Sequence, residues 1–289
     1  NNLQIPSSVG AGTYAMNLHL VGTLFGRDTV SQDIVLSDSF LVLSRGTLVL
    51  SSIVLSDTVV SHGSTDETLS LSVLNTGQAP ALIFSADSIK LSTISSDAVL
   101  TLSSGQVFPL TINGGDSSLF VYDITVGTTF TGQDTFQTSI SYEDVNSGVE
   151  YVASDSNVFD SWRVLSNVSL NIISLNAQES RVTQGQSGLA VSLEISNTGE
   201  TAAVIGSADS IGLTFFANNN LVTLVSPFLP DTIQPASSQI YDFAVDINQS
   251  AATGVDSLAG FVIGRNVLTG AVSSVNSTYL DNWNVQTPA

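Results

Sequence analysis

The chain contains no cysteine and only one lysine, Lys90. Without thiols, neither disulfide bonds nor thiolate metal sites are available, so the fold must be held together by packing. Lysine–asparagine cross-links are also excluded as a general substitute, because the counterpart of Lys90 122 residues later is Gly212.

Basic residues as a class are scarce. Six lysines and arginines stand against 25 acidic residues, which gives a formal net charge of −19, yet only 11% of the chain is charged. The acidity therefore reflects missing Lys and Arg. Because phosphates are bound by clustered basic residues, and the five arginines are scattered, we expect no binding to nucleic acid or anionic lipid.

Long apolar runs and targeting signals are absent from the printed sequence. No stretch approaches the 18 apolar residues of a membrane span, so we expect no membrane insertion. No charged start followed by an apolar stretch marks a signal peptide. The chain is interpreted as a mature or excised piece of an extracellular, cell-surface protein.

Residues for catalysis are few. The two histidines, His19 and His62, have no neighbour in a metal-binding spacing, and we interpret both as surface residues. No Gly-x-Ser-x-Gly elbow accompanies the plentiful serines. We therefore expect a protein that is not an enzyme and uses no cofactor.

The chain does contain a repeat of about 122 residues. A segment of five residues that begins with Asp and has an aromatic residue in its centre occurs three times, at positions separated by 122 and 121 residues. We call this segment the tag. Two further motifs recur at an offset of 122, Asn-Thr-Gly at 75–77 and 197–199, and Ser-Ala-Asp-Ser-Ile at 85–89 and 207–211. A fixed period of this size indicates one domain copied in tandem. The three tags begin at Asp38, Asp160 and Asp281.

Each repeat has the pattern of a β domain. Apolar residues alternate with Ser or Thr at Leu69, Leu71 and Val73, which is the period of a strand with one wet face. About seven such runs per copy, separated by turn residues, predict an all-β chain of tandem immunoglobulin-like sandwiches. A glycine closes one strand pair in every copy, where positive φ is expected, at Gly26, Gly148 and Gly270.

The offsets predict the domain boundaries. Residues 47–167 and 168–285 form complete modules, residues 286–289 begin a linker, and residues 1–46 align with 123–168. The first segment thus supplies only the later strands of a module. Its apolar face cannot stay open without inviting pairing. Either strands that precede this segment in a longer protein cover it, or another subunit does so by strand addition. The residues of this assembly face are Tyr14, Met16, Leu18 and Leu20.

One acidic loop is a candidate calcium site. Asp144, Asn146 and Glu150 offer oxygen ligands of the kind that calcium prefers. The alternative is a plain turn, because Asn-Ser-Gly is good turn chemistry and the third copy has lost the carboxylates at 266–270. We favour the turn.

The tag residues also have two interpretations. The recurring aromatic, Phe40, Trp162 or Trp283, could form a sugar-stacking platform, but core packing is favoured. The aspartate that opens each tag is expected to brace the turn into the last strand. Three sequons are candidate glycosylation sites, at Asn167, Asn248 and Asn276.

The alternating strand that ends in Asn75-Thr76-Gly77, and again in Asn197-Thr198-Gly199, resembles the CARDB-type adhesion repeats of bacterial and archaeal surface proteins. The resemblance covers both complete copies and implies a surface scaffold or adhesin with an immunoglobulin-like fold. We expect an extracellular structural protein of a filament or surface layer, with copies of itself as partners. The alternative is an adhesin that binds glycans or host surfaces.

Overall fold

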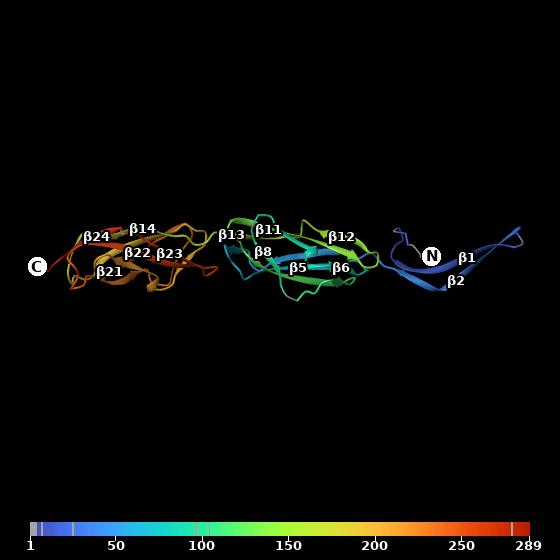
Figure 1. Ribbon diagram of the computed structural model, residues 1–289, viewed down its shortest axis with the longest axis horizontal. Helices are drawn as coiled ribbons and strands as arrows, with labels where there is room; N and C mark the ends of the chain where they lie inside the picture. The colour runs from blue at the N-terminus through green and yellow to red at the C-terminus, as the bar shows by residue number, and fades with distance from the viewer. Residues whose placement is uncertain (1–4, 7, 25, 96, 104, 279) are drawn as a thin grey trace.

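The computed structural model describes residues 5–6, 8–24, 26–95, 97–103, 105–278 and 280–289. Residues 1–4 of the predicted partial module therefore lie outside the described residues. Figure 1 shows an N-terminal hairpin, a first sandwich and a second sandwich in a row along the long axis. The hairpin consists of β1 (Gly12–Leu24) and β2 (Asp28–Val42).

The first sandwich contains two sheets. Its strands are β3 (Leu48–Leu55), β4 (Val59–Ser61), β5 (Glu67–Asn75), β6 (Ala81–Ile83), β7 (Ile89–Thr93), β8 (Val99–Leu102), β9 (Leu110–Ile112), β10 (Ser117–Thr125), β11 (Gly132–Asp144), β12 (Val149–Ser154) and β13 (Asp160–Leu165), with a short 3-10 turn η1 (Ala86–Ser88). One sheet has the order β3-β5-β10-β8. The other has the order β4-β13-β11-β6-β9, and β7 and β12 also pair with β11.

This strand order is that of an immunoglobulin-like sandwich. β3, β5, β10 and β8 take the places of strands A, B, E and D, and β6, β11 and β13 take those of C, F and G. The first strand changes sheets, because β4 pairs in parallel with β13. The prediction of an all-β chain of immunoglobulin-like sandwiches is confirmed.

The second sandwich has the same two sheets, β14-β16-β21-β19 and β15-β24-β22-β17-β20, with β18 and β23 on β22. β14, β15, β16, β17 and β22 each begin and end 122 residues after β3, β4, β5, β6 and β11. The bounds are β14 (Leu170–Ala177), β15 (Arg181–Thr183), β16 (Leu189–Asn197), β17 (Ala203–Ile205), η2 (Ala208–Ser210), β18 (Ile211–Phe215), β19 (Leu221–Ser226), β20 (Asp231–Ile233), β21 (Ser237–Asp246), β22 (Gly254–Asn266), β23 (Val272–Asn276) and β24 (Asp281–Gln286).

Each sandwich has a separate core. The first runs from Leu48 to Val164 and the second from Val168 to Val285. The tag tryptophans lie inside these cores and are 1% exposed. Trp162 packs edge-on against Phe136 and Trp283 stacks on Phe215, with ring centroids 4.9 and 5.7 Å apart. The core-packing interpretation of both rings is confirmed, and neither can serve as a sugar platform.

The closing glycines have the backbone conformation that their positions predict. Gly26, Gly148 and Gly270 have φ of 73°, 67° and 70°. At Gly148 and Gly270 the amide donates to a carbonyl four residues earlier, at 2.8 Å in both copies. A side chain at these positions would be strained, which explains why glycine recurs there.

Candidate functional site: the hairpin and the junctions

The hairpin carries an open apolar face. β1 and β2 form a two-stranded antiparallel sheet of their own. The predicted assembly residues are spaced two apart along β1, so they share one face. Tyr14, Leu18 and Leu20 are 36%, 43% and 47% exposed, and Met16 is partly buried.

β2 completes this face. Phe40 and Ile34 lie opposite Tyr14 and Leu18, and the Phe40 ring stacks on Tyr14 with centroids 5.7 Å apart. We call Tyr14, Met16, Leu18, Leu20, Ile34 and Phe40 the hairpin face. The matching residues of β11 are Phe136, Thr138, Ile140 and Tyr142, which are 0 to 6% exposed against the opposite sheet. The hairpin therefore presents, without a cover, the side chains that a complete sandwich buries.

The other face of the hairpin is mixed, because it carries polar side chains together with the exposed Val21, Val35 and Leu41. His19 Nδ1 contacts Asp33 Oδ1 across the strands, and both side chains are exposed. Val35, on the same face opposite Asn17, is 76% exposed. This face matches the outer surface of a sandwich, which needs no partner. His62, the second histidine, is half-buried, and its Nε2 lies 2.8 Å from the carbonyl oxygen of Phe130.

The tag aspartates join the first and last strands of each sandwich. Asp160 Oδ1 accepts from the N–H of Ser161 at 2.8 Å, which is the predicted local brace. Its second oxygen accepts from the N–H of Leu55 at the end of β3, and Asp281 does the same for Ala177. Asp38 holds the same place in the hairpin, where the described residues contain no counterpart of β3.

A polar junction connects the two sandwiches. Its centre is Ser61, the last residue of β4, which is fully buried. The Ser61 hydroxyl donates to Asn167 Oδ1 at 3.0 Å and accepts from Asn266 Nδ2 at 2.9 Å. Thr201 Oγ1 lies 3.3 Å from the same hydroxyl. A buried network of this kind favours one geometry, since other arrangements leave its members unpaired.

The linker is fastened by reciprocal hydrogen bonds. Ser166 N–H donates to Glu200 Oε2 at 3.0 Å, Glu200 N–H donates to Ser166 Oγ at 3.2 Å, and the Thr201 hydroxyl donates to Ser166 O at 2.7 Å. Arg163 and Glu200 also form an ion pair at 3.7 Å, but the pair is largely exposed and contributes little. Hydrogen bonds, not charge, hold this junction.

The hairpin joins the first sandwich in the same manner. Ser44 and Gln78 stand 122 residues before Ser166 and Glu200. Ser44 N–H donates to Gln78 Oε1 and Gln78 N–H donates to Ser44 Oγ, both at 3.0 Å. The linker geometry thus recurs at both joints.

The Asn-Thr-Gly motif is structural, and its hydrogen bonds could not be predicted from the sequence. Asn75 is fully buried; its oxygen accepts from the N–H groups of Thr47 and Gly77, and its amide donates to the carbonyls of Ala79 and Ile112, at 2.9 to 3.0 Å. Asn197 makes the same four bonds in the second sandwich. The glycine is needed because a Cβ on Gly77 would lie 1.9 Å from a backbone oxygen.

The candidate calcium loop is a hydrogen-bonded turn. Asp144 is 1% exposed, and its two oxygens accept from the N–H groups of Gly46 and Ser147. Burial acts to raise the pKa of this carboxyl, but these hydrogen bonds outweigh burial and lower the pKa. Asn146 and Glu150 are exposed. Within the described ranges, no group of three His, Cys, Asp or Glu side chains is placed to hold a metal ion.

The three sequons lie in different environments. Asn167 belongs to the junction, where its oxygen accepts two hydrogen bonds. Asn248 Oδ1 accepts from the N–H and the hydroxyl of Ser250 at 2.9 and 2.8 Å. Asn276 is exposed at the end of β23. Glycosylation at these residues stays a prediction.

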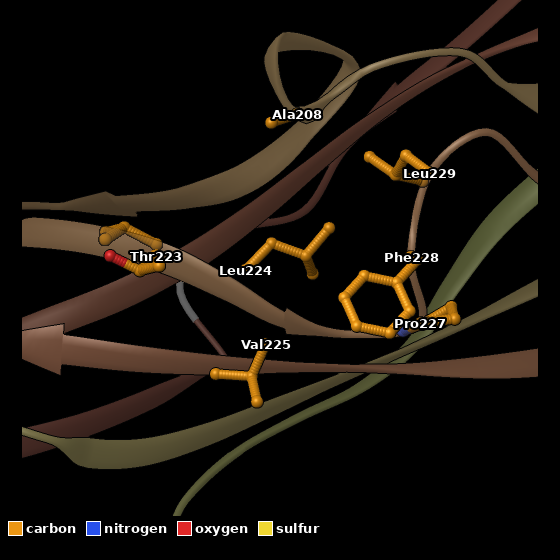
Figure 2. Close-up of a pocket in the computed structure, with 8 residues that line it drawn as sticks. Ala208, Thr223, Leu224, Val225, Pro227, Phe228 and Leu229 are labelled. Atoms are coloured by element: carbon orange, nitrogen blue, oxygen red, sulfur yellow. The ribbon is translucent and has the colours of Figure 1, made fainter.

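The second sandwich has an apolar groove that the sequence did not reveal. It has a volume of about 350 Å³ and lies between β19 and the loop that follows it. Figure 2 shows Leu224 and Phe228 facing its interior, with Leu229 on the far wall. Phe228 is 90% exposed, and Val107, its counterpart in the first sandwich, is 78% exposed. The lining residues are Ala208, Val222, Thr223, Leu224, Val225, Pro227, Phe228 and Leu229.

Comparisons with known proteins leave the family open. Among the described residues, no helix is long and apolar enough to cross a membrane. No protein-family model matches the chain, and no curated protein matches it significantly. The resemblance to CARDB-type repeats is therefore supported only as far as the immunoglobulin-like fold, which the strand order shows.

Several solved structures align with the chain at low similarity. The YadV chaperone is 14% identical over 78% of this chain and 99% of its own, with a TM-score of 0.23. The CupB2 chaperone of Pseudomonas aeruginosa is 9% identical over 77% and 98%, with a TM-score of 0.20. A Salmonella alpha-2-macroglobulin mutant is 12% identical over 95% and 19%, with a TM-score of 0.29. TM-scores this far below 0.5 establish neither a shared architecture nor a shared role.

Proposed function

We propose that this protein is a non-enzymatic structural subunit of an extracellular filament or surface layer. In this proposal, the hairpin face of one subunit is covered by strands of a neighbouring copy. The observation that carries the proposal is the open hairpin face, whose counterparts in β11 are almost completely buried. An apolar surface of this kind is a site for strand or sheet addition.

Burial of the hairpin face contributes favourably to association. Full burial of a large apolar side chain is worth about 1.5–3 kcal/mol. Tyr14, Leu18 and Leu20 are already between half and two-thirds covered. Covering the rest, together with new backbone hydrogen bonds along the strand edges, is worth on the order of 3–5 kcal/mol.

The junction supports a mechanical role. Ser61 ties the first sandwich to Asn167 of the linker and Asn266 of the second sandwich. Modules held together by such a network act as a stiff rod, which suits a load-bearing element. The scarcity of lysine and arginine, which leaves few sites for trypsin-like cleavage, also suits an exposed location.

Two matched variants test the proposal. Leu18→Asp places a charge in the hairpin face, and Val35→Asp places the same charge on the opposite face. In sedimentation velocity and electron microscopy, we expect the native chain and Val35→Asp to associate end to end and Leu18→Asp to remain monomeric. Equal behaviour of all three proteins would refute assembly through the hairpin face.

One observation favours an adhesin as a second candidate. Phe228 is 90% exposed beside an apolar groove on the second sandwich. An exposed ring next to a groove is suited to stacking on a sugar. A reproducible hit on a glycan array that is lost in Phe228→Ser would support this function, and an array without hits would argue against it.

A further inference from the structure

The outer face of the larger sheet differs between the two sandwiches. Phe261 and Ile263 point outward from β22, and Val272 lies on the same face of β23, diagonal to Ile263. Ile263 and Val272 are 39% and 57% exposed, and Phe261 is partly exposed. We call these three residues the outer stripe. Their counterparts 122 residues earlier, on the same face of the first sandwich, are polar: Ser139, Ser141 and Glu150.

The ring of Phe261 lies against the backbone of the neighbouring strand β18. A Cβ at Gly212, which is directly opposite Phe261 on that strand, would be 2.8 Å from the ring. In the first sandwich the place of Gly212 is taken by Lys90, which lies opposite Ser139. Glycine therefore makes room for the ring, because a larger side chain would displace it. The ring rests on the outer surface of the sheet, with part of it open to solvent.

The direct neighbour of this ring is the asparagine of a sequon. Asn276 pairs with Phe261 across β22 and β23, so the two side chains share the outer face, with Cβ atoms about 5 Å apart. Residues 276–278 have the sequence Asn-Ser-Thr. The corresponding pair in the first sandwich is Ser139 and Ser154. The aromatic ring and the sequon asparagine thus occur together in the second sandwich and are both serine in the first.

Asn276 is also the least constrained of the three sequon asparagines. It is exposed, and within the described part of the chain no hydrogen bond holds its side chain. Asn167 is fixed in the junction by two hydrogen bonds, and Asn248 accepts two from Ser250. A substituent on Asn276 would therefore extend over the sheet without breaking a contact of the fold.

We propose that Asn276 carries an N-linked glycan whose first sugar packs on Phe261 and covers the outer stripe. A phosphate-activated sugar donor supplies the glycosyl group. The bond between C1 and Asn276 Nδ2 forms, the phosphate leaves with the electron pair of the broken C1–O bond, and Nδ2 loses one proton. The C–H groups on one face of a sugar suit contact with an aromatic ring. Its hydroxyl groups face water, so the exposed apolar stripe gains a polar surface. This inference does not depend on assembly through the hairpin face.

Peptide mapping by mass spectrometry of the protein from its native source tests the acceptor. We expect a glycan on Asn276 and none on Asn167. An unmodified Asn276 would overturn the proposal. If, in addition, the unmodified chain associates with rising concentration and Phe261→Ser abolishes this in sedimentation velocity, the outer stripe is an interface with a second copy instead.

A single sugar tests the contact with the ring. The chain has no cysteine, so Asn276→Cys provides one thiol to which a thiol-reactive hexose is attached. Unfolding of the second sandwich is followed by Trp283 fluorescence in a Trp162→Phe background. We expect the hexose to lower the unfolding equilibrium constant by about threefold to tenfold, the scale of one aromatic contact.

Two controls separate this contact from a general effect of the sugar. Phe261→Ser installs the residue of the first sandwich and should abolish the stabilisation. A hexose on Asn248→Cys, in the loop between β21 and β22, should leave the equilibrium constant unchanged. Equal stabilisation with and without the Phe261 ring would refute the packing of the sugar on the outer stripe.

Discussion

Replacement of Asn197 by alanine provides a sharp test of how each sandwich is held together. The side chain is fully buried and bonds the N–H groups of Ser169 and Gly199 and the carbonyls of Thr201 and Ile233. It thereby joins four segments: the start of β14, the end of β16, the loop that follows β16, and strand β20. Alanine removes all four bonds and leaves four backbone groups without their partner.

The expected loss follows from that count. Each hydrogen bond contributes about 1 kcal/mol net, and a buried group left unpaired costs about 1–3 kcal/mol. Relaxation and water entry reduce the sum, so we expect about 4 kcal/mol. Since a domain of this size is stable by about 5–15 kcal/mol, the variant loses a large part of its stability and its urea midpoint falls by roughly 2 M.

The chain offers a clean assay, because each core holds one of its two tryptophans. In a Trp162→Phe background, fluorescence reports only the second sandwich through Trp283. Asn171→Ala is the matched control; it removes one exposed bond to Thr198 and should cost less than about 0.5 kcal/mol. A loss below about 1 kcal/mol in Asn197→Ala would refute the structural role assigned to the motif.

Three further predictions concern single positions. Asp281→Ala removes the acceptor for Ala177 N–H, 2.7 Å away. In urea denaturation, the free energy of unfolding of the second sandwich should fall by about 1–2 kcal/mol. Asp38→Ala is the control and should not change stability. Gly199→Ala places a Cβ 2.1 Å from the carbonyl oxygen of Asn167, so the linker must move. We expect the free energy of unfolding to fall by more than about 2 kcal/mol and the small-angle scattering profile to change. An unchanged profile would contradict the close approach. Burial raises the pKa of Tyr122 to about 12 from the usual 10. The neutral Tyr122 phenol therefore contributes fully to stability below pH 10, and this contribution is lost as the pH rises toward 12. The free energy of unfolding of the first sandwich should fall by roughly 2 kcal/mol over that interval, and Tyr122→Phe should abolish the loss.

The parts of the fold that depend on local pattern could be predicted from the sequence. Alternation at Leu69, Leu71 and Val73 indicated a strand with one buried face, and these three residues are fully buried in β5. Recurrence of an aromatic in the tag indicated core packing, and Trp162 and Trp283 are both buried. Such features are readable because they depend on neighbours along one strand.

The parts that depend on distant residues could not be predicted. The junction joins Ser61, Asn167 and Asn266, and nothing local marks Ser61 among so many serines. The four partners of Asn75 likewise come from separate segments. The bond of Asp144 to Ser147 belongs to the local turn that the sequence favours, whereas its bond to Gly46, 98 residues away, depends on the tertiary fold.

Thiol accessibility measures directly whether the hairpin face is covered in the assembled protein. The native chain has no cysteine, so Leu18→Cys and Val35→Cys each introduce one unique thiol, on opposite faces of the hairpin. We expect assembly to slow modification of Leu18→Cys by roughly 100-fold, while Val35→Cys stays reactive. Equal reactivity of the two thiols in assembled material would contradict coverage of the hairpin face.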